Sequence, residues 1–404
     1  MKTGTTYLQN VLRENSADLL AQGVYYPAGA DVPSQRHAVW DLVGRRTRGS
    51  RDDRIAGQWQ ALTEAVARTD ASTVVLSEEY LASATGRQAR RAVAGFPDRE
   101  VHVLVTARDL GRVLSSAWQE EVKNGSTRTW GDYLAAVRDP RQRGQDPARA
   151  FWLRHDLPGV VDTWAGVVGP ERLHMVTVPP PGAPREVLLS RVGGLVGFDP
   201  SRLSDTSPRA NESLGAPATE VLRRVNERLH GRLNERQYDK VVKLSLQRRL
   251  AGARQTQPPW LPREDVEWAT AEAERMIGHL ATGRYDVVGA LDELLPVRPA
   301  DADRPKESRT EAGRAQQVRT DQVRSEELLE ASIDAMTALA EDYASTWWRL
   351  RQADVARVAP RSAAVRAASA VRGAGFRVRR VGADFADRNR IGATAMRVYL
   401  RLRR

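Results

Sequence analysis

The chain has 404 residues, and its 62 Lys and Arg against 51 Asp and Glu give a formal net charge of +11. It contains no cysteine, which excludes disulfides and thiolate metal sites, and its six histidines show no metal-ligand spacing, so no metal is expected. No run of about 18 apolar residues is present to span a membrane and no secretory signal opens the chain, which predicts a cytoplasmic protein.

The first residues, Met-Lys-Thr-Gly-Thr-Thr, lead directly into an amphipathic helix predicted over residues 5–21. Free N–H groups and the positive end of the helix dipole attract anions, Gly4 allows a close backbone approach, and Lys2 adds a positive charge. Lys2 is also one of only five lysines, against 57 arginines. The segment predicts an anion site, although the GxxxxGK[ST] spacing of a Walker A loop is absent. An ordinary capped helix start is the alternative.

Helices and strands alternate along the rest of the chain. Apolar strands are predicted over residues 72–76, 100–107 and 172–178. Helices are predicted over residues 51–68, 87–94, 109–124, 130–137, 160–168, 184–196, 214–230, 235–251 and 263–281, with a polar loop at 139–149. This alternation predicts an α/β fold in which helices flank a parallel sheet.

The strand at 100–107 is followed directly by Arg108 and then by a helix that carries Ser116. Ligands of open α/β sheets bind at the carboxyl ends of the strands. A guanidinium group suits a phosphate dianion, and a helical hydroxyl supplies a directional donor. The pair therefore predicts a phosphate site. The alternative is a helix capped by Asp109, with Arg108 in a surface ion pair.

Together the two motifs resemble the donor site of sulfotransferases, which take sulfate from 3′-phosphoadenosine-5′-phosphosulfate. The first is similar to their 5′-phosphosulfate loop and the second to their 3′-phosphate site. Segments 176–184, 210–215 and 285–289 look like a bacterial branch of the family, so the resemblance spans residues 1–296. It implies a P-loop NTPase-like sulfotransferase fold and that nucleotide as co-substrate. The acceptor would be a hydroxyl or amine of an unidentified carbohydrate, lipid-linked compound or small metabolite.

The resemblance also implies roles for individual residues. Lys2 would stabilise the bridging oxygen as the S–O bond breaks, and Arg108 and Ser116 would hold the 3′-phosphate. The remaining loop residues, Thr3, Gly4, Thr5 and Thr6, would donate to the 5′-phosphate and the sulfonate. Candidate adenine contacts are Asn211, Ser213 and a basic residue within 247–254; residues 211–214 are also suited to a plain helix cap.

The catalytic base is expected from a Glu or a His. Glu79 follows the strand at 72–76 at the family's Ser-x-Glu position, and Glu78 is the fallback. A carboxylate there can take a proton if burial raises its pKa. It can equally be a helix-start carboxylate favoured by the dipole. His37, in a polar segment that leads into a helix, is the second candidate.

Other histidines and aromatic residues are open to packing or binding roles. His102 and His174 fall within predicted strands and are expected to be core residues, whereas His155 is a candidate for the pocket wall. The aromatic residues that suit either a core or stacking on an acceptor are Tyr26, Trp40, Trp118 and Trp152.

Sulfotransferases place a β-strand immediately before the loop, and none precedes Met1 here. A parallel sheet without its central first strand would leave two neighbouring strands with unpaired edges, which is costly. The resemblance therefore predicts that the true start lies upstream and that a short strand is encoded there. A truncated, unstable relative is the alternative.

The C-terminal part has a different composition. Residues 297–324 have the charged, Pro-bearing composition of a linker, and 325–352 are predicted to form a helix with an apolar stripe. Residues 353–404 carry thirteen arginines and three aspartates, a net charge of +10. Because residues 1–352 are then nearly neutral, no specific nucleic-acid partner is expected for them. The basic tail is either a disordered soluble segment or one that lies on an anionic membrane surface or polyanion, which would place the protein on the inner membrane face.

Two other functions remain open at this point. A P-loop kinase-like enzyme would need a Walker A sequence and an Asp to hold Mg²⁺, and neither is evident. A non-catalytic scaffold could use the basic tail alone, but it would not need Lys2, Arg108 and Ser116 in these positions.

Overall fold

The computed structural model describes residues 3–29, 32–45, 55–204, 214–247, 250, 258–297, 328–333, 335, 336 and 339. The chain divides into two units, Met1–Ala338 and Leu339–Arg404. Apart from Leu339, every described residue belongs to the first unit. The predicted linker at 297–324, except Val297, and the whole basic tail at 353–404 lie outside the described residues.

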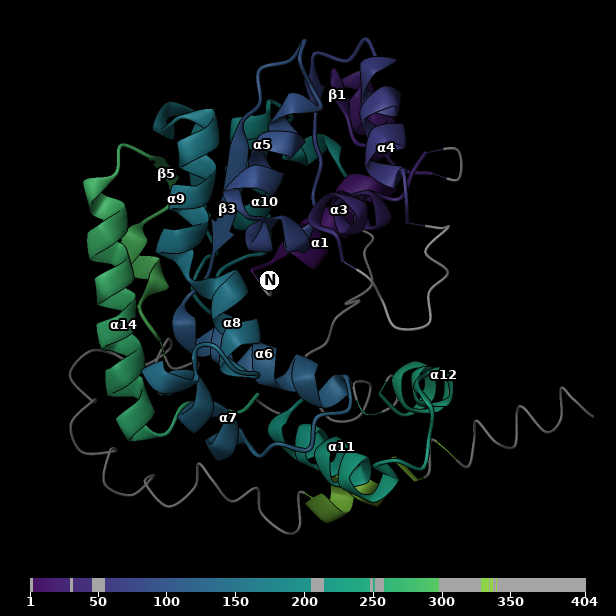
Figure 1. Cartoon of the computed structure of the whole chain (residues 1–404), viewed down its shortest axis with the longest axis vertical. Coiled ribbons are helices and arrows are strands. Elements are labelled where there is room, and N and C mark those ends of the chain that lie inside the picture. The colour runs from purple at the N-terminus through teal and green to yellow at the C-terminus, as the bar shows by residue number, and fades with distance from the viewer. Residues whose placement is uncertain are drawn as a thin grey trace, which may run out of the picture. The chain divides into compact units, whose positions relative to one another are not determined.

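Parallel strands form two small sheets in the described part of the chain (Figure 1). The strands are β1 Val24–Tyr25, β2 Thr73–Val74, β3 Val103–Ala107, β4 Leu173–Thr177 and β5 Asp286–Val288. β1 pairs with β2, while β3, β4 and β5 lie in that order in a second sheet, with every pairing parallel. The predicted α/β class with parallel strands is confirmed. β1 and β5 were not predicted, although the equally short β2 was, within the apolar run at 72–76.

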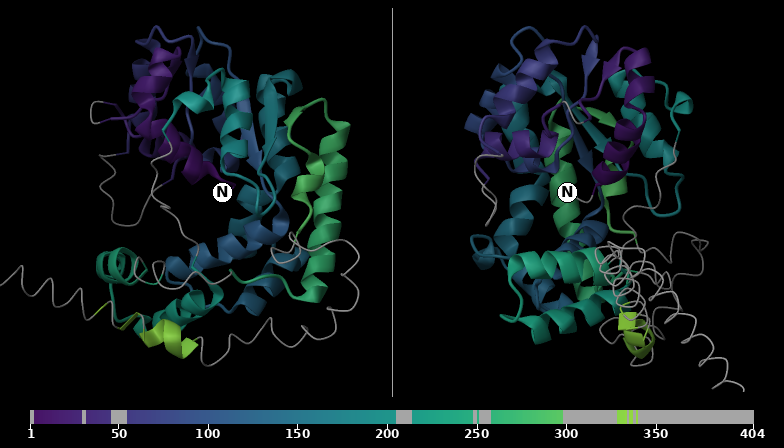
Figure 2. Two further views of the ribbon diagram at one scale, coloured as in Figure 1. Left: turned by 180° about the vertical axis from the view of Figure 1, so that it is seen from behind. Right: turned by 90° about the vertical axis from the view of Figure 1, so that its right-hand side faces the viewer.

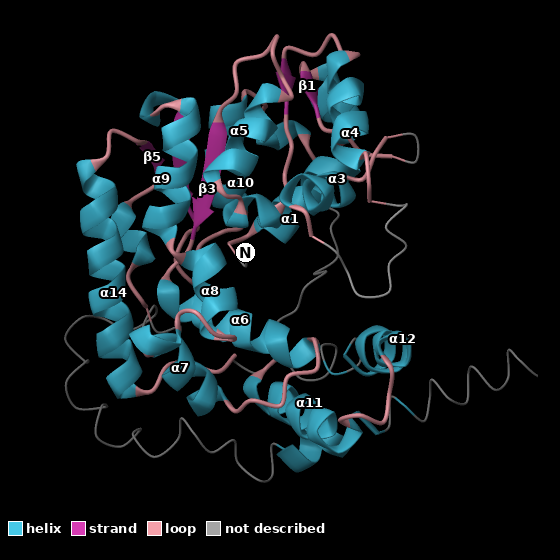
Figure 3. Ribbon diagram, viewed as in Figure 1, coloured by secondary structure: helices cyan, strands magenta, loops and turns pink. Residues whose placement is uncertain are grey.

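Most of the described chain is helical (Figure 3). The helices before β3 are α1 Thr5–Glu14, α2 Ser16–Ala21, α3 Gln35–Val43, α4 Gln58–Ala67 and α5 Gly86–Ala94, with the 3-10 helix η2 at Glu79–Ser83. The helices after β3 are α6 Leu110–Lys123, α7 Trp130–Arg138, α8 Ala148–His155, α9 Leu157–Val168, α10 Glu186–Val196, α11 Ala216–Leu229, α12 Glu235–Tyr238, the π-helix η6 Asp239–Leu246 and α14 Arg263–Thr282. Shorter 3-10 turns are η3 Pro140–Gln142, η4 Pro170–Arg172, η5 Pro200–Arg202 and η7 Leu291–Leu294. None of the described helices has both the length and the apolar composition needed to cross a bilayer.

The single helix predicted over residues 5–21 is wrong, because the helix is interrupted at Asn15. The Asn15 side-chain amide donates to the carbonyls of Val11 (2.8 Å) and Ser204 (2.9 Å). Its Oδ1 accepts from the Ser204 amide at 2.8 Å. An Asn side chain that bonds to nearby backbone competes with the helical ladder, so α1 ends there and α2 begins as a separate helix.

Three other predicted boundaries also need correction. The helix predicted over 51–68 begins only at Gln58, after Gly57 in the left-handed conformation (φ 80°). The predicted polar loop at 139–149 contains the turn η3 and the start of α8. The helix predicted over 235–251 is a short α-helix followed by a π-helix.

Helices cover both faces of the larger sheet (Figure 2). Side chains alternate along a strand, so Leu173 and Met175 of β4 pack into one core with α5 and α9, while Val176 packs into the opposite core with α1 and α10. A third core is entirely helical. It surrounds buried aromatic residues such as Trp118 and Tyr133, between α6, α7, α8, α11 and α14.

Candidate functional site

The loop that precedes α1 contacts the carboxyl ends of two strands that are distant in sequence. The hydroxyl oxygen of Thr3 lies 2.7 Å from that of Thr106, near the end of β3. The Thr5 hydroxyl donates to Glu79 Oε1 at 2.8 Å, just beyond the end of β2. Thr3 itself is buried, at 6% exposure. These contacts bring the predicted anion-binding loop next to the strand end that carries the predicted phosphate-binding Arg108.

Helix α1 is held against the end of β2 by a buried polar side chain. Gln9 Nε2 donates to the Ser77 carbonyl at 3.0 Å and to the Ser77 hydroxyl at 3.3 Å. Neither Gln9 nor Thr106 was predicted from the sequence. The available signal for Gln9 was a polar residue among the apolar residues Leu8 and Val11 of the predicted helix. The signal for Thr106 was its hydroxyl two residues before Arg108.

Gly4 is the N-cap of α1 and has φ 79°, a left-handed conformation that suits glycine. A Cβ added at this position would collide with the Leu188 side chain from α10. The loop therefore needs glycine both for its turn and for its close contact with the neighbouring helix.

We expect Gly4→Ala to lower the melting temperature and to weaken anion binding at the loop. A left-handed alanine costs roughly 1–2 kcal/mol, and displacement of Leu188 adds to that cost. Gly44→Ala is the matched control, because Gly44 has φ 70° and a Cβ added there would meet no neighbouring atom within 4 Å. If Gly4→Ala and Gly44→Ala weaken anion binding equally, the left-handed conformation and close packing of Gly4 do not contribute to the anion site.

Arg108 is half-buried, and its pKa is lowered to about 10 because burial disfavours the charged form and the nearby Arg112 repels it. Asp109 opposes this effect, but its carboxylate is bonded to the Arg112 guanidinium and accepts from the Arg112 amide at 2.9 Å. Asp109 therefore caps α6, as the alternative interpretation of this segment expected. Arg108 is a desolvated cation that a bound anion would stabilise.

Ser116 is half-buried on α6, one turn beyond Arg112. Residues four apart lie on the same face of a helix, so Ser116 continues the face that begins at Arg112. The neighbouring Ser115 lies on another face and is buried at 3% exposure. Its hydroxyl has no hydrogen-bond partner within the described residues.

The two adjacent glutamates beyond β2 have different surroundings. The Glu78 side chain is only 7% exposed, and its Oε2 lies 3.9 Å from Arg36 Nε. Burial raises the pKa of Glu78 above its usual value, and Arg36 opposes that rise. Glu79, in contrast, begins η2 and accepts the hydrogen bond from Thr5 in the loop. Of the two, Glu79 is the carboxylate in direct contact with the loop.

We expect Glu78→Gln to raise the melting temperature at pH 7 and to have less effect near pH 4. The raised pKa means that the folded protein holds this proton at pH values where the unfolded chain, with its usual value of 4.5, has lost it. Ionisation of Glu78 therefore lowers stability as pH rises from 4.5 through the raised pKa, and glutamine removes that loss. Melting curves of the original protein and of Glu78→Gln at several pH values measure this difference in stability. A larger stabilisation at pH 4 than at pH 7 would contradict the assignment.

His37 lies on α3, which is bonded to the same strand end. The Ser77 amide donates to Oε1 of Gln35, the first residue of α3, at 2.7 Å. The His37 ring lies 5.6 Å from Trp40, and Trp40 lies 6.1 Å from Tyr80. Among the described residues His37 forms no hydrogen bond, and its ring contact is with Trp40.

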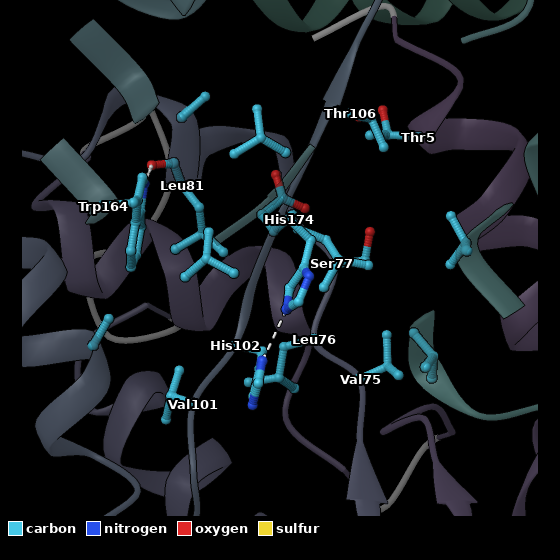
Figure 4. Close-up of a pocket in the computed structure, with 18 of the residues that line it drawn as sticks. Thr5, Val75, Leu76, Ser77, Leu81, Val101, His102, Thr106, Trp164 and His174 are labelled. Carbon is cyan, nitrogen blue, oxygen red and sulfur yellow. Dashed lines mark hydrogen bonds between the residues drawn. The ribbon is translucent and has the colours of Figure 1, made fainter. Parts of the chain in front are cut away.

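The expectation that His102 and His174 are core residues is wrong. His102 Nδ1 lies 2.9 Å from His174 Nε2 (Figure 4), and His174 Nδ1 lies 2.7 Å from Asp286 Oδ2. His102 is exposed, because this polar chain lies toward the amino ends of β3, β4 and β5. It is therefore at the opposite end of the sheet from the loop. His155 does line a cavity, one that also reaches Thr3 and Thr5, and burial lowers its pKa well below the usual value.

Three of the four aromatic residues considered for stacking on an acceptor belong to the core. Tyr26, Trp118 and Trp152 are 5%, 3% and 6% exposed. Only Trp40 is half-buried. The predicted contacts at Lys2, Asn211 and Ser213 lie outside the described residues, as do most of residues 247–254.

No family model, curated protein or solved structure matches the chain. Within the described ranges, no three or more His, Asp and Glu side chains are grouped so that they could hold a metal ion.

Proposed function

We propose that the protein is a sulfotransferase that uses 3′-phosphoadenosine-5′-phosphosulfate as donor and a hydroxyl or amine as acceptor. The observation that carries the proposal is the hydrogen bond between Thr3 and Thr106. It joins the two motifs that resemble the two phosphate sites of the donor, although they are about a hundred residues apart. A nucleotide with phosphates at both its 5′ and 3′ positions could contact both motifs at once.

In the proposed reaction the acceptor oxygen or nitrogen attacks the sulfur atom in line with the bridging oxygen. The new bond to sulfur forms as the bond between sulfur and the bridging oxygen breaks, and adenosine 3′,5′-bisphosphate leaves. Such transfers depend mainly on positioning and on electrostatic stabilisation of the developing charge. Lys2 would stabilise the bridging oxygen, and the hydroxyl and N–H groups of Thr5 and Thr6 would stabilise the sulfonate.

The acceptor proton would pass to Glu79. Its carboxylate already accepts a hydrogen bond from Thr5, so it lies within reach of a group bound at the loop. Glu78 is less accessible, because its side chain is buried beside Arg36. His37 is the remaining alternative, since α3 contacts the same strand end.

Incubation of the protein with donor that carries radioactive sulfur, a panel of acceptors and a chelator tests the proposal. We expect label to move to an acceptor at a rate that the chelator does not change, because the proposed step uses no metal. Magnesium-dependent transfer of phosphate from ATP would support the kinase-like alternative. An absence of thermal stabilisation by adenosine 3′,5′-bisphosphate would support the non-catalytic scaffold, because a ligand that binds the folded state must stabilise it.

A further inference from the structure

Helix α8 ends close to the carboxylate that we propose as the base. Its last two residues, Arg154 and His155, line a cavity of about 1110 Å³ that also reaches Thr3, Thr5 and Glu79. α8 packs against η2, the 3-10 helix that begins at Glu79. The end of α8 therefore forms part of the wall of the space that borders both the loop and the proposed base.

Arg154 is a half-buried cation that no described residue pairs with directly. Its Nε is buried and forms no hydrogen bond within the described part of the chain. Arg149 of the same helix, in contrast, is exposed, and its Nε lies 3.4 Å from Asp146 Oδ1. Burial of a charged group is costly unless an opposite charge and hydrogen bonds compensate it. Arg154 is thus suited to bind an anion that enters the cavity.

Glu121 on α6 compensates the charge of Arg154 only in part. Burial raises the pKa of Glu121 above its usual value, and Arg128 and Arg154 both oppose that rise from nearby. Glu121 is therefore shared between two arginines, and it forms no direct ion pair with either of them in the structure. A carboxylate whose charged form is disfavoured by burial is also a weak counterion.

The neighbouring His155 is neutral. Burial lowers its pKa well below the usual value, and the charge of Arg154 adds to that effect. The His155 ring lies 4.7 Å from the Phe151 ring. A neutral imidazole still supplies one N–H donor. This wall of the cavity therefore offers one positive charge, from Arg154, and one directional donor, from His155.

The position of Arg154 differs from that of the residues proposed to hold the donor. The donor residues lie in the loop before α1 and around the carboxyl end of β3, whereas Arg154 belongs to α8 and lies near the proposed base by way of η2. An acceptor must bring its hydroxyl or amine to Glu79, so a second group on the acceptor would come close to the end of α8.

We infer that Arg154 binds an anionic group of the acceptor, a carboxylate, a sulfate or a phosphate, and that the acceptors are therefore acidic hydroxyl or amine compounds. A guanidinium group matches such anions with two parallel hydrogen bonds. An acidic acceptor would supply the hydrogen bonds and the opposite charge that Arg154 lacks. Assignment of the anion to the acceptor rests on the proposed function, but the anion site at Arg154 does not.

Calorimetric titration with inorganic phosphate tests the inference in two arms, one without nucleotide and one with saturating adenosine 3′,5′-bisphosphate. In the second arm the nucleotide occupies the loop and Arg108, so phosphate binding reports on Arg154. We expect Arg154→Met to weaken phosphate binding there by at least about tenfold and to leave bisphosphate binding unchanged.

Two further variants serve as controls for this titration. Arg154→Lys keeps the charge but not the planar fork of donors, so its phosphate affinity should lie between those of the original protein and Arg154→Met. Arg149→Met removes an exposed arginine from the same helix. We expect it to change the binding of neither phosphate nor bisphosphate.

Several results would overturn the inference. If no phosphate binds once the nucleotide site is full, or if Arg154→Met weakens bisphosphate binding, Arg154 belongs to the donor site. A lower melting temperature of Arg154→Met with unchanged phosphate affinity would leave Arg154 only a structural role, as a cation favoured by the dipole in the last turn of α8. An uncharged acceptor whose KM is the same for the original protein and Arg154→Met would contradict the acceptor class.

Failure of the proposed function is distinguishable from failure of this inference. A protein that binds no bisphosphate would contradict the sulfotransferase proposal. The arm without nucleotide would then decide on the anion site at Arg154 alone: loss of phosphate affinity in Arg154→Met but not in Arg149→Met would support the site, and equal affinities would overturn it.

Discussion

Replacing Lys2 by methionine will lower turnover by about 10²–10³-fold while the dissociation constant of adenosine 3′,5′-bisphosphate changes much less. The reason is that the charge on the bridging oxygen develops in the transition state, so the loss falls on kcat rather than on ground-state binding. Rates measured with labelled donor and binding measured by calorimetry separate the two quantities.

Lys240→Met is the matched control, because Lys240 is an exposed lysine of the π-helix η6. We expect it to leave both quantities unchanged. If Lys2→Met weakens nucleotide binding as much as it lowers turnover, Lys2 is a binding residue and the catalytic role proposed for it is wrong.

Arg108→Ala will weaken binding of adenosine 3′,5′-bisphosphate by about tenfold to a hundredfold and will hardly affect adenosine 5′-phosphate. Only the first nucleotide carries a 3′-phosphate, and a charge-assisted hydrogen bond is worth roughly 1.5–3 kcal/mol. The lowered pKa of Arg108 increases the expected effect, because a bound dianion would replace the solvation that burial has removed.

Arg91→Ala is the control for charge alone, since Arg91 is exposed on α5. We expect Arg91→Ala to change the binding of either nucleotide only slightly, through the loss of one distant positive charge. Equal losses for both nucleotides in Arg108→Ala would place the arginine elsewhere than at the 3′-phosphate.

The parts of the fold that the sequence predicts well are those with long hydrophobic periods. The strand and helix around Arg108 were predicted to within three residues, because an apolar run followed by a capped helix is a strong local pattern. The short strands β1 and β5 were missed, whereas the equally short β2 was predicted within the apolar run at 72–76. The break at Asn15 was missed because it depends on a hydrogen bond to Ser204, which is distant in sequence.

The same distinction between local sequence patterns and contacts distant in sequence applies to the candidate site. Loop residues and Arg108 could be singled out by their chemistry. Thr106, which contacts Thr3, and Gln9, which donates to Ser77, could not, because only the folded chain brings these pairs together. The sequence pattern also gave the wrong surroundings for two histidines. His102 and His174 lie in apolar runs that predict burial, yet they bond to each other at an exposed end of the sheet.

The difference between the two glutamates is likewise visible only in three dimensions. The resemblance ranks Glu79 before Glu78, but only the folded chain shows that Glu78 is buried against Arg36 and that Glu79 accepts from Thr5. The contact with Thr5 supports the proposal of Glu79 as the base, and burial gives Glu78 its raised pKa.

Calorimetric titration of the unmodified protein with adenosine 3′,5′-bisphosphate, adenosine 5′-phosphate and adenosine 3′-phosphate tests the central claim most directly. The claim is that the loop at Thr3–Thr6 and the strand end at Arg108 form one nucleotide site. We predict that the bisphosphate binds at least about tenfold more tightly than either monophosphate, since it alone can occupy both halves. Equal affinity for all three nucleotides, or no binding of the bisphosphate, would contradict the account.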